Sequence, residues 1–210
     1  MTPDAPVYWF DEIDSTNEEA RRSAQGGDFG PRWIAGRRQT AGRGRLGRQW
    51  ASPTGNLYVT ALFQDFDGFA HATRYPFASG LAILDACAAF VPDVRIELKW
   101  PNDVRQAGRK LCGILVEAGQ SSGKAIWIAC GMGINIQSTP ESAGQAATSL
   151  SDLGASAGID ADTFLGALRP AFVARCRQAK QDFPRLLKDW QQVAEGLRDH
   201  LLDPADIVRE

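Results

Sequence analysis

A glycine- and arginine-rich stretch, QTAGRGRLGRQW at residues 39–50, sets the strongest limit on what this chain can fold into. Glycines and arginines alternate along it (Gly42, Arg43, Gly44, Arg45, Gly47 and Arg48). A core segment would not carry so much fixed charge. Glycine lets backbone N–H groups approach an anion closely, and arginine offers a planar fork of donors for phosphate or carboxylate. We therefore predict a mobile loop that closes over a phosphate-bearing ligand; a solvated basic loop and a nucleic-acid contact remain alternatives for this stretch alone.

The charge and composition of the whole chain limit its partners. Its 210 residues carry a formal net charge of −2, so no global basic field is present to hold DNA or RNA, and we expect no nucleic-acid partner. The apolar content of 44% fits a globular domain. No apolar run approaches the roughly 20 residues of a membrane span, and residues 1–10 lack the features of a signal peptide. We expect a cytoplasmic protein without a membrane partner.

The cysteines and histidines limit the chemistry. Four cysteines stand in apolar surroundings without a C-x-x-C pair, which predicts buried free thiols in a reducing compartment (Cys87, Cys112, Cys130 and Cys176). His71 and His200 are far apart in sequence, so neither a histidine metal site nor a Ser–His nucleophilic pair is expected. Any chemistry should therefore rest on positioning and electrostatics.

Segments of strand and helix character alternate along the chain. β-Branched and aromatic runs predict strands at 7–13, 32–38, 56–63, 94–98, 110–117 and 125–130, the last two joined by a turn at 121–123. Apolar residues at helical spacing predict helices at 16–24, 77–90, 161–179 and 183–196, with a short helical piece at 148–153 inside a loop. The pattern predicts an α/β fold in which helices pack on a mixed β-sheet.

Polar turns at the ends of these elements are candidate ligand sites. Ser15 and Glu18 form a capping box, which either serves the helix alone or presents hydroxyl and N–H groups to a ligand. The turn from Lys99 to Asp103 holds opposite charges, and its plain alternative is a surface ion pair that stabilises by at most about 1 kcal/mol. Lys110 begins a buried strand, and GMGIN at 131–135 indicates close backbone approach to a ligand.

Five motifs together resemble the catalytic domain of biotin–protein ligases. They are the Ser-Thr-Asn turn at 15–17, the loop at 39–50, KWPND at 99–103, KLCGILVE at 110–117 and GMGIN at 131–135. Their order and spacing match over about residues 8–153. The resemblance implies the class II synthetase-like biotin/lipoate ligase fold, α/β (α+β) with a mixed sheet packed by helices.

The resemblance also implies a two-step acyl transfer. Biotin's carboxylate attacks the α-phosphate of ATP and gives biotinyl-5′-AMP and pyrophosphate. A lysine of a carboxylase carrier domain then attacks the mixed anhydride and releases AMP. Arginines, together with Mg²⁺ held mainly by the ATP phosphates, would offset the repulsion between the two anions.

By the same resemblance, one set of residues binds biotin. It comprises Ser15, Thr16, Asn17, Gln39, Gly42, Arg43, Gly44, Arg45, Trp50, Lys110, Gly113 and Ile114. Within it, Ser15, Thr16 and Gln39 are expected to hydrogen-bond the ureido ring. Trp50 is expected to form an apolar wall, and the backbone at Gly113 and Ile114 to line the channel for the biotin tail.

A second set binds the nucleotide. It comprises Arg43, Arg45, Arg48, Trp50, Lys99, Asn102 and Asn135. Arg45 is expected on the phosphate, Arg43 and Arg48 on triphosphate or pyrophosphate oxygens, and Asn135 near the phosphates or the metal. For Lys99, a phosphate contact and a role in shaping the turn remain open.

Three residues are the catalytic candidates. Lys110 is expected at the junction of carboxylate and phosphate, Arg45 on the adenylate, and Asp103 beside the incoming lysine, which it would orient or deprotonate. Glu117 is interpreted as a structural partner rather than a base. The glycine–arginine loop is expected to be disordered without ligand and to fold over biotinyl-5′-AMP.

Two alternative functions remain open. A lipoate or octanoate ligase or transferase would share the fold, and related transferases use a Lys–Cys pair. Cys112 lies two residues after Lys110, so on a regular strand both would share a face; we interpret Cys112 as a core residue. A non-catalytic protein that binds biotin or its adenylate is the second alternative.

The resemblance also sets expectations for the chain ends and the assembly. We expect a catalytic domain at 1–200 and a short tail at 201–210. The N-terminal DNA-binding domain and the SH3-like C-terminal domain of the family are expected to be absent. Exposed sheet edges make a homodimer an expectation as well.

Overall fold

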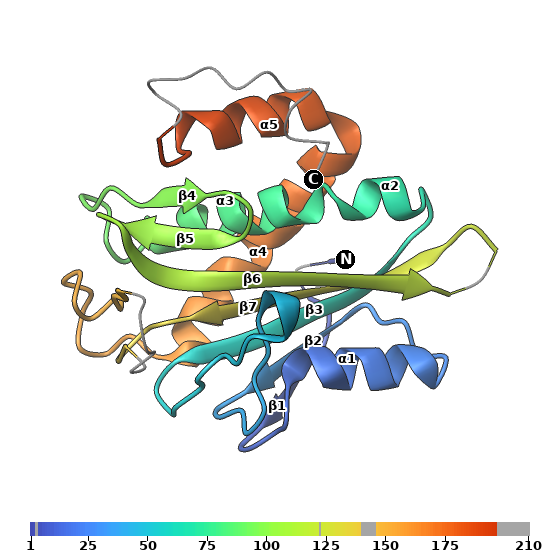
Figure 1. The fold of residues 1–210 in the computed structure, drawn as a ribbon, viewed down its shortest axis with the longest axis horizontal. Helices are drawn as coiled ribbons and strands as arrows, with labels where there is room; N and C mark the ends of the chain where they lie inside the picture. Colours follow the sequence, from blue (N-terminus) through green and yellow to red (C-terminus); the bar gives the residue numbers. More distant parts are fainter. Residues whose placement is uncertain (3, 122, 140–145, 197–210) are drawn as a thin grey trace.

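The computed structural model describes residues 1–2, 4–121, 123–139 and 146–196, and it is built on one seven-stranded sheet. The strands follow the order β1-β2-β3-β7-β6-β5-β4 (Figure 1). Their bounds are β1 Val7–Phe10, β2 Arg32–Gly36, β3 Leu57–Asp65, β4 Glu97–Lys99, β5 Asp103–Gln106, β6 Arg109–Gln120 and β7 Ile126–Ile134.

The strand directions make the sheet mixed. β1 and β2 pair in parallel, because α1 (Thr16–Gln25) connects them as a crossover helix. The remaining neighbours pair antiparallel. The long ladder β3-β7-β6 forms the centre of the sheet, and it brings residues 57–65, 126–134 and 112–120 into register. The predicted mixed sheet packed by helices is confirmed.

Helices cover the two faces of the sheet unequally (Figure 1). α1 packs against β2, β3 and β7 on one face. On the other face α3 (Tyr75–Cys87) and α4 (Ala161–Gln181) pack against the sheet and each other, and α5 (Phe183–Gln192) packs on both helices. A short helix of four residues, α2 (Phe69–Ala72), precedes α3. The face that carries α1 is therefore left partly open, and the functional pocket lies there.

The apolar core fills the space between the sheet and the α3–α4 layer. Trp33 of β2 meets Phe172 of α4 edge to face, with ring centroids 5.3 Å apart. Phe63 of β3 meets Tyr75 of α3 in the same way at 5.1 Å. Such aromatic pairs add to the hydrophobic gain from burial. The four cysteines are buried and free, as the sequence predicts.

The last predicted helix ends earlier than expected, and the reason is a strand-like contact. Residues after Gln192 leave the helix and lie along β4, where Leu98 N donates to Val193 O at 2.9 Å and Glu195 N donates to Leu98 O at 2.8 Å. These bonds satisfy the outer edge of a three-residue strand. The prediction of helix up to residue 196 is wrong because this tertiary pairing competes with the helical hydrogen bonds.

Two other predicted elements also differ, and one strand was missed. The strand expected at 94–98 is confined to β4, and β5 was not predicted as a strand. The short helix expected at 148–153 is wrong: Ser149 and Asp152 cap each other through 2.9 and 3.1 Å hydrogen bonds within successive turns. The turn expected at 121–123 lies partly outside the described residues, and the tail at 201–210 lies wholly outside them.

No helix in the described part of the chain is both long enough and apolar enough to span a membrane.

A buried carboxylate at the end of β3 ties three elements together. Asp65 is fully buried, and it accepts hydrogen bonds from the Tyr75 hydroxyl, from Asp67 N at 2.8 Å and from Lys180 Nζ at 3.1 Å. Burial alone would raise the pKa of Asp65, but these donors outweigh it and hold the pKa below its ordinary value. The ionised carboxylate therefore stabilises the junction of β3, α3 and α4.

We predict that Tyr75→Phe lowers the free energy of unfolding by roughly 1.5–3 kcal/mol at pH 7, because it removes a hydrogen bond to a buried charge. The loss should shrink as the pH falls below about 4, where Asp65 becomes protonated in the unfolded and then the folded protein. Urea unfolding at several pH values measures both effects. Tyr8→Phe, at a half-exposed hydroxyl on β1, is the control; an equal loss in both variants would contradict the assignment.

Candidate functional site

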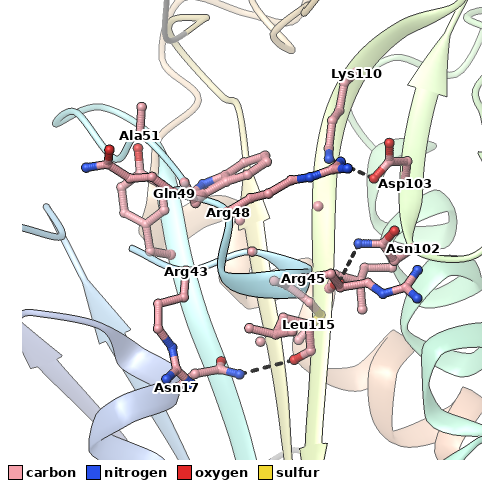
Figure 2. A pocket seen from close by; sticks show the side chains of 18 of the residues that line it. Asn17, Arg43, Arg45, Arg48, Gln49, Ala51, Asn102, Asp103, Lys110 and Leu115 are labelled. Carbon is pink, nitrogen blue, oxygen red and sulfur yellow. Dashed lines mark hydrogen bonds and ion pairs between the residues drawn. The ribbon is translucent and has the colours of Figure 1, made fainter. Parts of the chain in front are cut away.

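A pocket of about 420 Å³ opens on the face of the sheet that carries α1. All five motifs identified in the sequence meet in its wall: the start of α1, the loop at 39–50, the turn at 99–103, and parts of β6 and β7 (Figure 2). Every predicted site residue except Gly42 lines it. Gly42 instead lies tightly behind the wall, where an added Cβ would be 2.4 Å from Trp50 O.

The start of α1 forms an uncharged polar end of the pocket. Ser15 caps the helix, and its Oγ accepts from Glu18 N at 3.5 Å. The second half of the predicted capping box is absent, because Ser15 N donates to Asp14 Oδ1 at 2.7 Å instead. A hydrogen bond from Arg22 lowers the pKa of Asp14 to about 2, so this acceptor stays ionised. The cap is thus firm without using the Glu18 side chain.

A chain of hydrogen bonds orders the side chains at this end. Thr16 N donates to Gln39 Oε1 at 2.9 Å, and Gln39 Nε2 contacts Ser52 Oγ at 2.9 Å. The buried Thr60 hydroxyl lies 2.9 Å from Thr16 Oγ1 and 2.6 Å from Asn17 Oδ1. Each donor and acceptor therefore has a defined direction before any ligand arrives.

Trp50 crosses the middle of the pocket over a pair of glycines. Gly113 of β6 and Gly133 of β7 are register partners, and a Cβ on either would lie 2.9 or 2.6 Å from the indole. The Lys110 ammonium lies 5.1 Å from the centroid of the same indole. Trp50 Nε1 is buried and lacks a hydrogen-bond partner among the described residues. The glycines are needed here because only a bare backbone leaves room for the ring.

The other end of the pocket is charged. Lys110 Nζ lies 2.7 Å from Asp103 Oδ1, and Arg105 Nη2 lies 3.5 Å from Asp103 Oδ2. Figure 2 shows Arg45 and Arg48 extending from the loop toward this group. Asp103 is the only carboxylate among the described residues that line the pocket. The ion pair foreseen between Lys99 and Asp103 is replaced by the pair with Lys110.

A β-bulge decides which side chains of β6 face the pocket. The register with β5 shifts between Val104 and Arg105, so that Leu111 is an extra residue on β6. Lys110 and Gly113 consequently face the pocket, while Cys112 is fully buried in the core. The prediction that Lys110 and Cys112 share a face is therefore wrong. Burial raises the pKa of the Cys112 thiol well above its ordinary value, so Cys112 is a core residue and not a nucleophile.

Asn102 and Asn135, which both line the pocket, make different structural contacts. Asn102 donates to Ile114 O at 3.0 Å and so docks the turn at 99–103 onto β6. Asn135 is 2% exposed and donates to Thr148 O at 3.0 Å, which joins β7 to the following segment. Its Oδ1 is buried and has no partner within the described ranges. That free acceptor suits a cation or a hydrogen-bond donor, and not a phosphate oxygen.

Arg43 differs from the other loop arginines. It contacts Glu18 Oε1 at 3.0 Å and Glu117 Oε1 at 2.6 Å, and Figure 2 shows its side chain pointing toward Asn17, away from Lys110. A hydrogen bond from Arg21 lowers the pKa of Glu18 and keeps that partner ionised. The interpretation of Glu117 as a structural partner agrees with these contacts.

Several lining residues were not predicted from the sequence. They are Leu46, Gln49, Ala51, Tyr58, Trp100, Pro101, Arg105, Leu115, Gly131, Met132, Gly133 and Ala147. Half of them lie on strands, where period-two alternation alone does not tell which face a ligand occupies. Gly131 and Gly133 carried a signal, because two glycines inside a strand indicate close approach.

Among the described residues that line the pocket, Asp103 alone offers a carboxylate as a metal ligand. Elsewhere, one ligand atom from each of Asp65, Asp67 and His71 lies within 4.8 Å of the others. The Lys180 ammonium already lies 3.1 Å from Asp65 and 3.3 Å from Asp67. A cation at that cluster would meet this positive charge, so we assign it a structural role.

We predict that Gly131→Ala destabilises the protein by roughly 1–3 kcal/mol, because the new Cβ would lie 1.9 Å from Asn17 Oδ1 and force the polar end apart. Thermal or urea unfolding measures the loss. Gly166→Ala is the matched control: that helical glycine has open space around it, and the change should be neutral or stabilise by up to about 1 kcal/mol. Equal stabilities of the two variants would refute the packing argument.

Comparisons with known proteins show which family this chain resembles. Residues 9–135 match the model of the biotin/lipoate A/B protein ligase family. The chain is 38% identical over 164 residues to the biotin–acetyl-CoA-carboxylase ligase of Paracoccus denitrificans, covering 76% of this chain and 68% of that protein. It is 36% identical over 182 residues to the enzyme of the same name from Mycobacterium tuberculosis, covering 84% and 66%.

Solved structures show the same arrangement. The structure of biotin protein ligase from Aquifex aeolicus in complex with biotin and ATP superposes with a TM-score of 0.75 at 27% sequence identity. The match covers 90% of this chain and 78% of that one. By length, the chain spans about two thirds of each of the two curated relatives.

Proposed function

The chain belongs to the biotin/lipoate A/B protein ligase family, and we propose that it is an ATP-dependent biotin–protein ligase. It activates biotin to biotinyl-5′-AMP and transfers the biotinyl group to a lysine of a biotin carboxyl-carrier domain. The observation that carries the proposal is the polarity of the pocket. One end, at α1, offers the neutral hydrogen-bonding side chains of Thr16, Asn17 and Gln39, beside an Arg43 already paired with Glu18 and Glu117, and the other end carries Arg45, Arg48, Lys110 and Asp103.

The uncharged end suits the ring of biotin. A ureido group is neutral and presents two N–H donors and one carbonyl acceptor in fixed directions. Thr16, Asn17 and Gln39 offer matching groups, already ordered by hydrogen bonds with Thr60 and Ser52. A pre-ordered site loses less conformational entropy on binding. Trp50 and the backbone of Gly113 then line the path of the apolar tail.

The charged end suits the first chemical step. The biotin carboxylate oxygen forms a bond to the α-phosphorus of ATP, and the bond from that phosphorus to the bridging oxygen breaks as pyrophosphate leaves. Two anions must meet for this to happen. Lys110, Arg45 and Arg48 line the pocket and would supply three positive charges where the anions meet, and such preorganised charge is worth more in a pocket than in water. Orientation supplies the rest of the rate enhancement.

The second step needs a neutral amine. The acceptor lysine attacks the acyl carbon of biotinyl-5′-AMP, an amide bond forms, and AMP leaves with the electron pair of the broken C–O bond. The attacking ammonium must first lose a proton, and Asp103 is the residue that we propose to accept that proton or to orient the amine. Lys110 Nζ is 2.7 Å from that carboxylate, so two of the three catalytic candidates lie side by side. No cysteine nucleophile takes part, because Cys112 is in the core.

Mg²⁺ would reach this site with ATP. One carboxylate lines the described part of the pocket, and it is already paired with Lys110, so the protein does not offer an all-protein cage for the ion. The unpartnered Asn135 Oδ1 is a fitting additional oxygen ligand or acceptor. When bound, the ion would supply neutralisation of phosphate charge.

The partners and compartment follow from the same activity. The protein partner is a carrier domain of a biotin-dependent carboxylase, as the names of the relatives suggest. Four free buried thiols fit a cytoplasmic enzyme. The homodimer stays a prediction, with β1 as the candidate interface because it is paired on one side only among the described strands.

A purified sample given biotin, ATP, Mg²⁺ and a biotin carboxyl-carrier domain tests the proposal. Mass spectrometry of the quenched reaction should show biotinyl-5′-AMP, pyrophosphate and a carrier heavier by one biotinyl group. Octanoate and lipoate in place of biotin form the comparison. Absence of both adenylate and labelled carrier, or preferred turnover of octanoate or lipoate, would overturn the proposal.

Arg45→Gly should release biotinyl-5′-AMP into solution faster, by roughly tenfold to a hundredfold, because it removes a charge-assisted contact to the adenylate and frees the tip of the loop. Radiolabelled adenylate separated from the protein on a filter measures the release rate. Arg95→Gly, at an exposed arginine paired with Glu97 outside the pocket, serves as the control. Retention by Arg45→Gly equal to that of the parent would refute this role.

A further inference from the structure

The three arginines of the glycine–arginine loop point to two different places. Arg48 extends toward Lys110 and Asp103 and Arg45 toward Asn102, whereas Arg43 points back toward Asn17 (Figure 2). Arg43 forms ion pairs with two carboxylates from outside the loop, those of Glu18 in α1 and Glu117 in β6. We infer that Arg43 is the anchor of the loop and that Glu117 is a positioning residue, which couples the loop to the biotin end of the pocket. The inference rests on the proposed function, which supplies the ligand.

The loop is a small hairpin, and Arg43 lies near its base. Trp50 N donates to Gly42 O at 2.9 Å, and Gly44 N donates to Arg48 O at 2.7 Å. A bridge between Arg43 and Gln49 completes the pairing. At the tip, Leu46 takes the left-handed conformation with φ 56°. Holding the Arg43 side chain therefore fixes the direction of the whole hairpin, including Arg45 and Arg48.

Glu117 uses both of its oxygens to join the two regions. Its Oε1 accepts from Arg43 at 2.6 Å, and its Oε2 accepts from Asn17 Nδ2 at 2.8 Å. Asn17 is buried, donates also to Leu115 O at 3.2 Å, and accepts from Thr60 at 2.6 Å. A ligand that engages Asn17 therefore acts on Glu117 directly, and Glu117 acts on the loop.

The local charge argues against phosphate at Arg43. Two carboxylates lie within 3.0 Å of its guanidinium, and Glu18 is shared with Arg21 at 2.6 Å. A phosphate placed there would meet both negative charges. Arg45 and Arg48 have no carboxylate within ion-pair distance among the described residues, so they are the arginines available to phosphates. This separates Arg43 from the role that the resemblance gave it.

The strength of the anchor suits a loop that must open. The side chains of Arg43, Glu117 and Glu18 are 36%, 29% and 19% exposed. Solvent screens ion pairs at such positions, so each contributes a modest free energy. The anchor can then bias the loop toward the closed position and still let substrates enter and the acceptor lysine approach.

A double-mutant cycle on Arg43→Gln and Glu117→Gln tests the inference. The first readout is the rate at which preformed biotinyl-5′-AMP leaves the protein. Each single change should raise that rate by roughly threefold to tenfold. The double variant should be no faster than the faster single variant, because both changes break one contact. Glu12→Gln and Arg38→Gln, an exposed pair beside the loop, form the control cycle.

The second readout needs no catalysis. Tryptic cleavage after Arg45 in the ligand-free protein reports how often the hairpin leaves its place. Both single variants should be cleaved several-fold faster than the parent, while their melting temperatures stay close to it. A merely structural role for Glu117 would lower the melting temperature and leave cleavage below that temperature unchanged.

The outcomes separate this inference from the proposed function. If the parent protein forms no adenylate, the proposed function fails, and the cleavage assay still decides whether Arg43 and Glu117 hold the hairpin. If adenylate forms and the effects of the two changes multiply in the double variant, Arg43 contacts the phosphate independently of Glu117. That result, or unchanged cleavage in Glu117→Gln, would overturn the inference.

Discussion

The packing of Trp50 against two facing glycines is the contact on which the rest of the site depends. Gly113 and Gly133 are register partners on β6 and β7, and neither tolerates a Cβ beneath the indole. The bare backbone lets the end of the glycine–arginine loop lie flat on the sheet. With Trp50 held there, the loop lines the same pocket as the polar side chains at the start of α1 and the charged pair Lys110–Asp103.

The two ends of the pocket separate recognition from chemistry. At the uncharged end, Thr16, Asn17 and Gln39 are ordered by buried hydrogen bonds, and such networks are rigid when every member is satisfied. At the charged end, Lys110 and Asp103 form a pair that leaves arginines free to meet phosphates. A neutral ring and a reacting anion can therefore be held by one pocket without placing an unpaired charge beside the ring.

Many residues that line the pocket could be predicted from the sequence, because the five motifs together resemble those of biotin–protein ligases. Ser15 is predicted to cap a helix, and in the structure it is the N-cap of α1. The predicted motifs meet in one pocket because they stand at strand ends, where loops carry function. Predictions failed where distant segments decided the outcome. The bulge on β6 moved Cys112 into the core, and pairing with β4 ended the last helix at Gln192.

The sequence by itself determined the mixed fold, the buried thiols and the chemistry of the five motifs, because hydrophobic period, capping and glycine–arginine content act over a few residues. Tertiary structure alone decided the direction of each side chain. Arg43, Arg45 and Arg48 look equivalent in sequence. In the structure, however, Arg43 forms ion pairs with Glu18 and Glu117, whereas Arg45 and Arg48 point elsewhere, toward the charged end of the pocket. Glu117 lies 74 residues from Arg43 along the chain, and only folding brings the two within hydrogen-bonding distance.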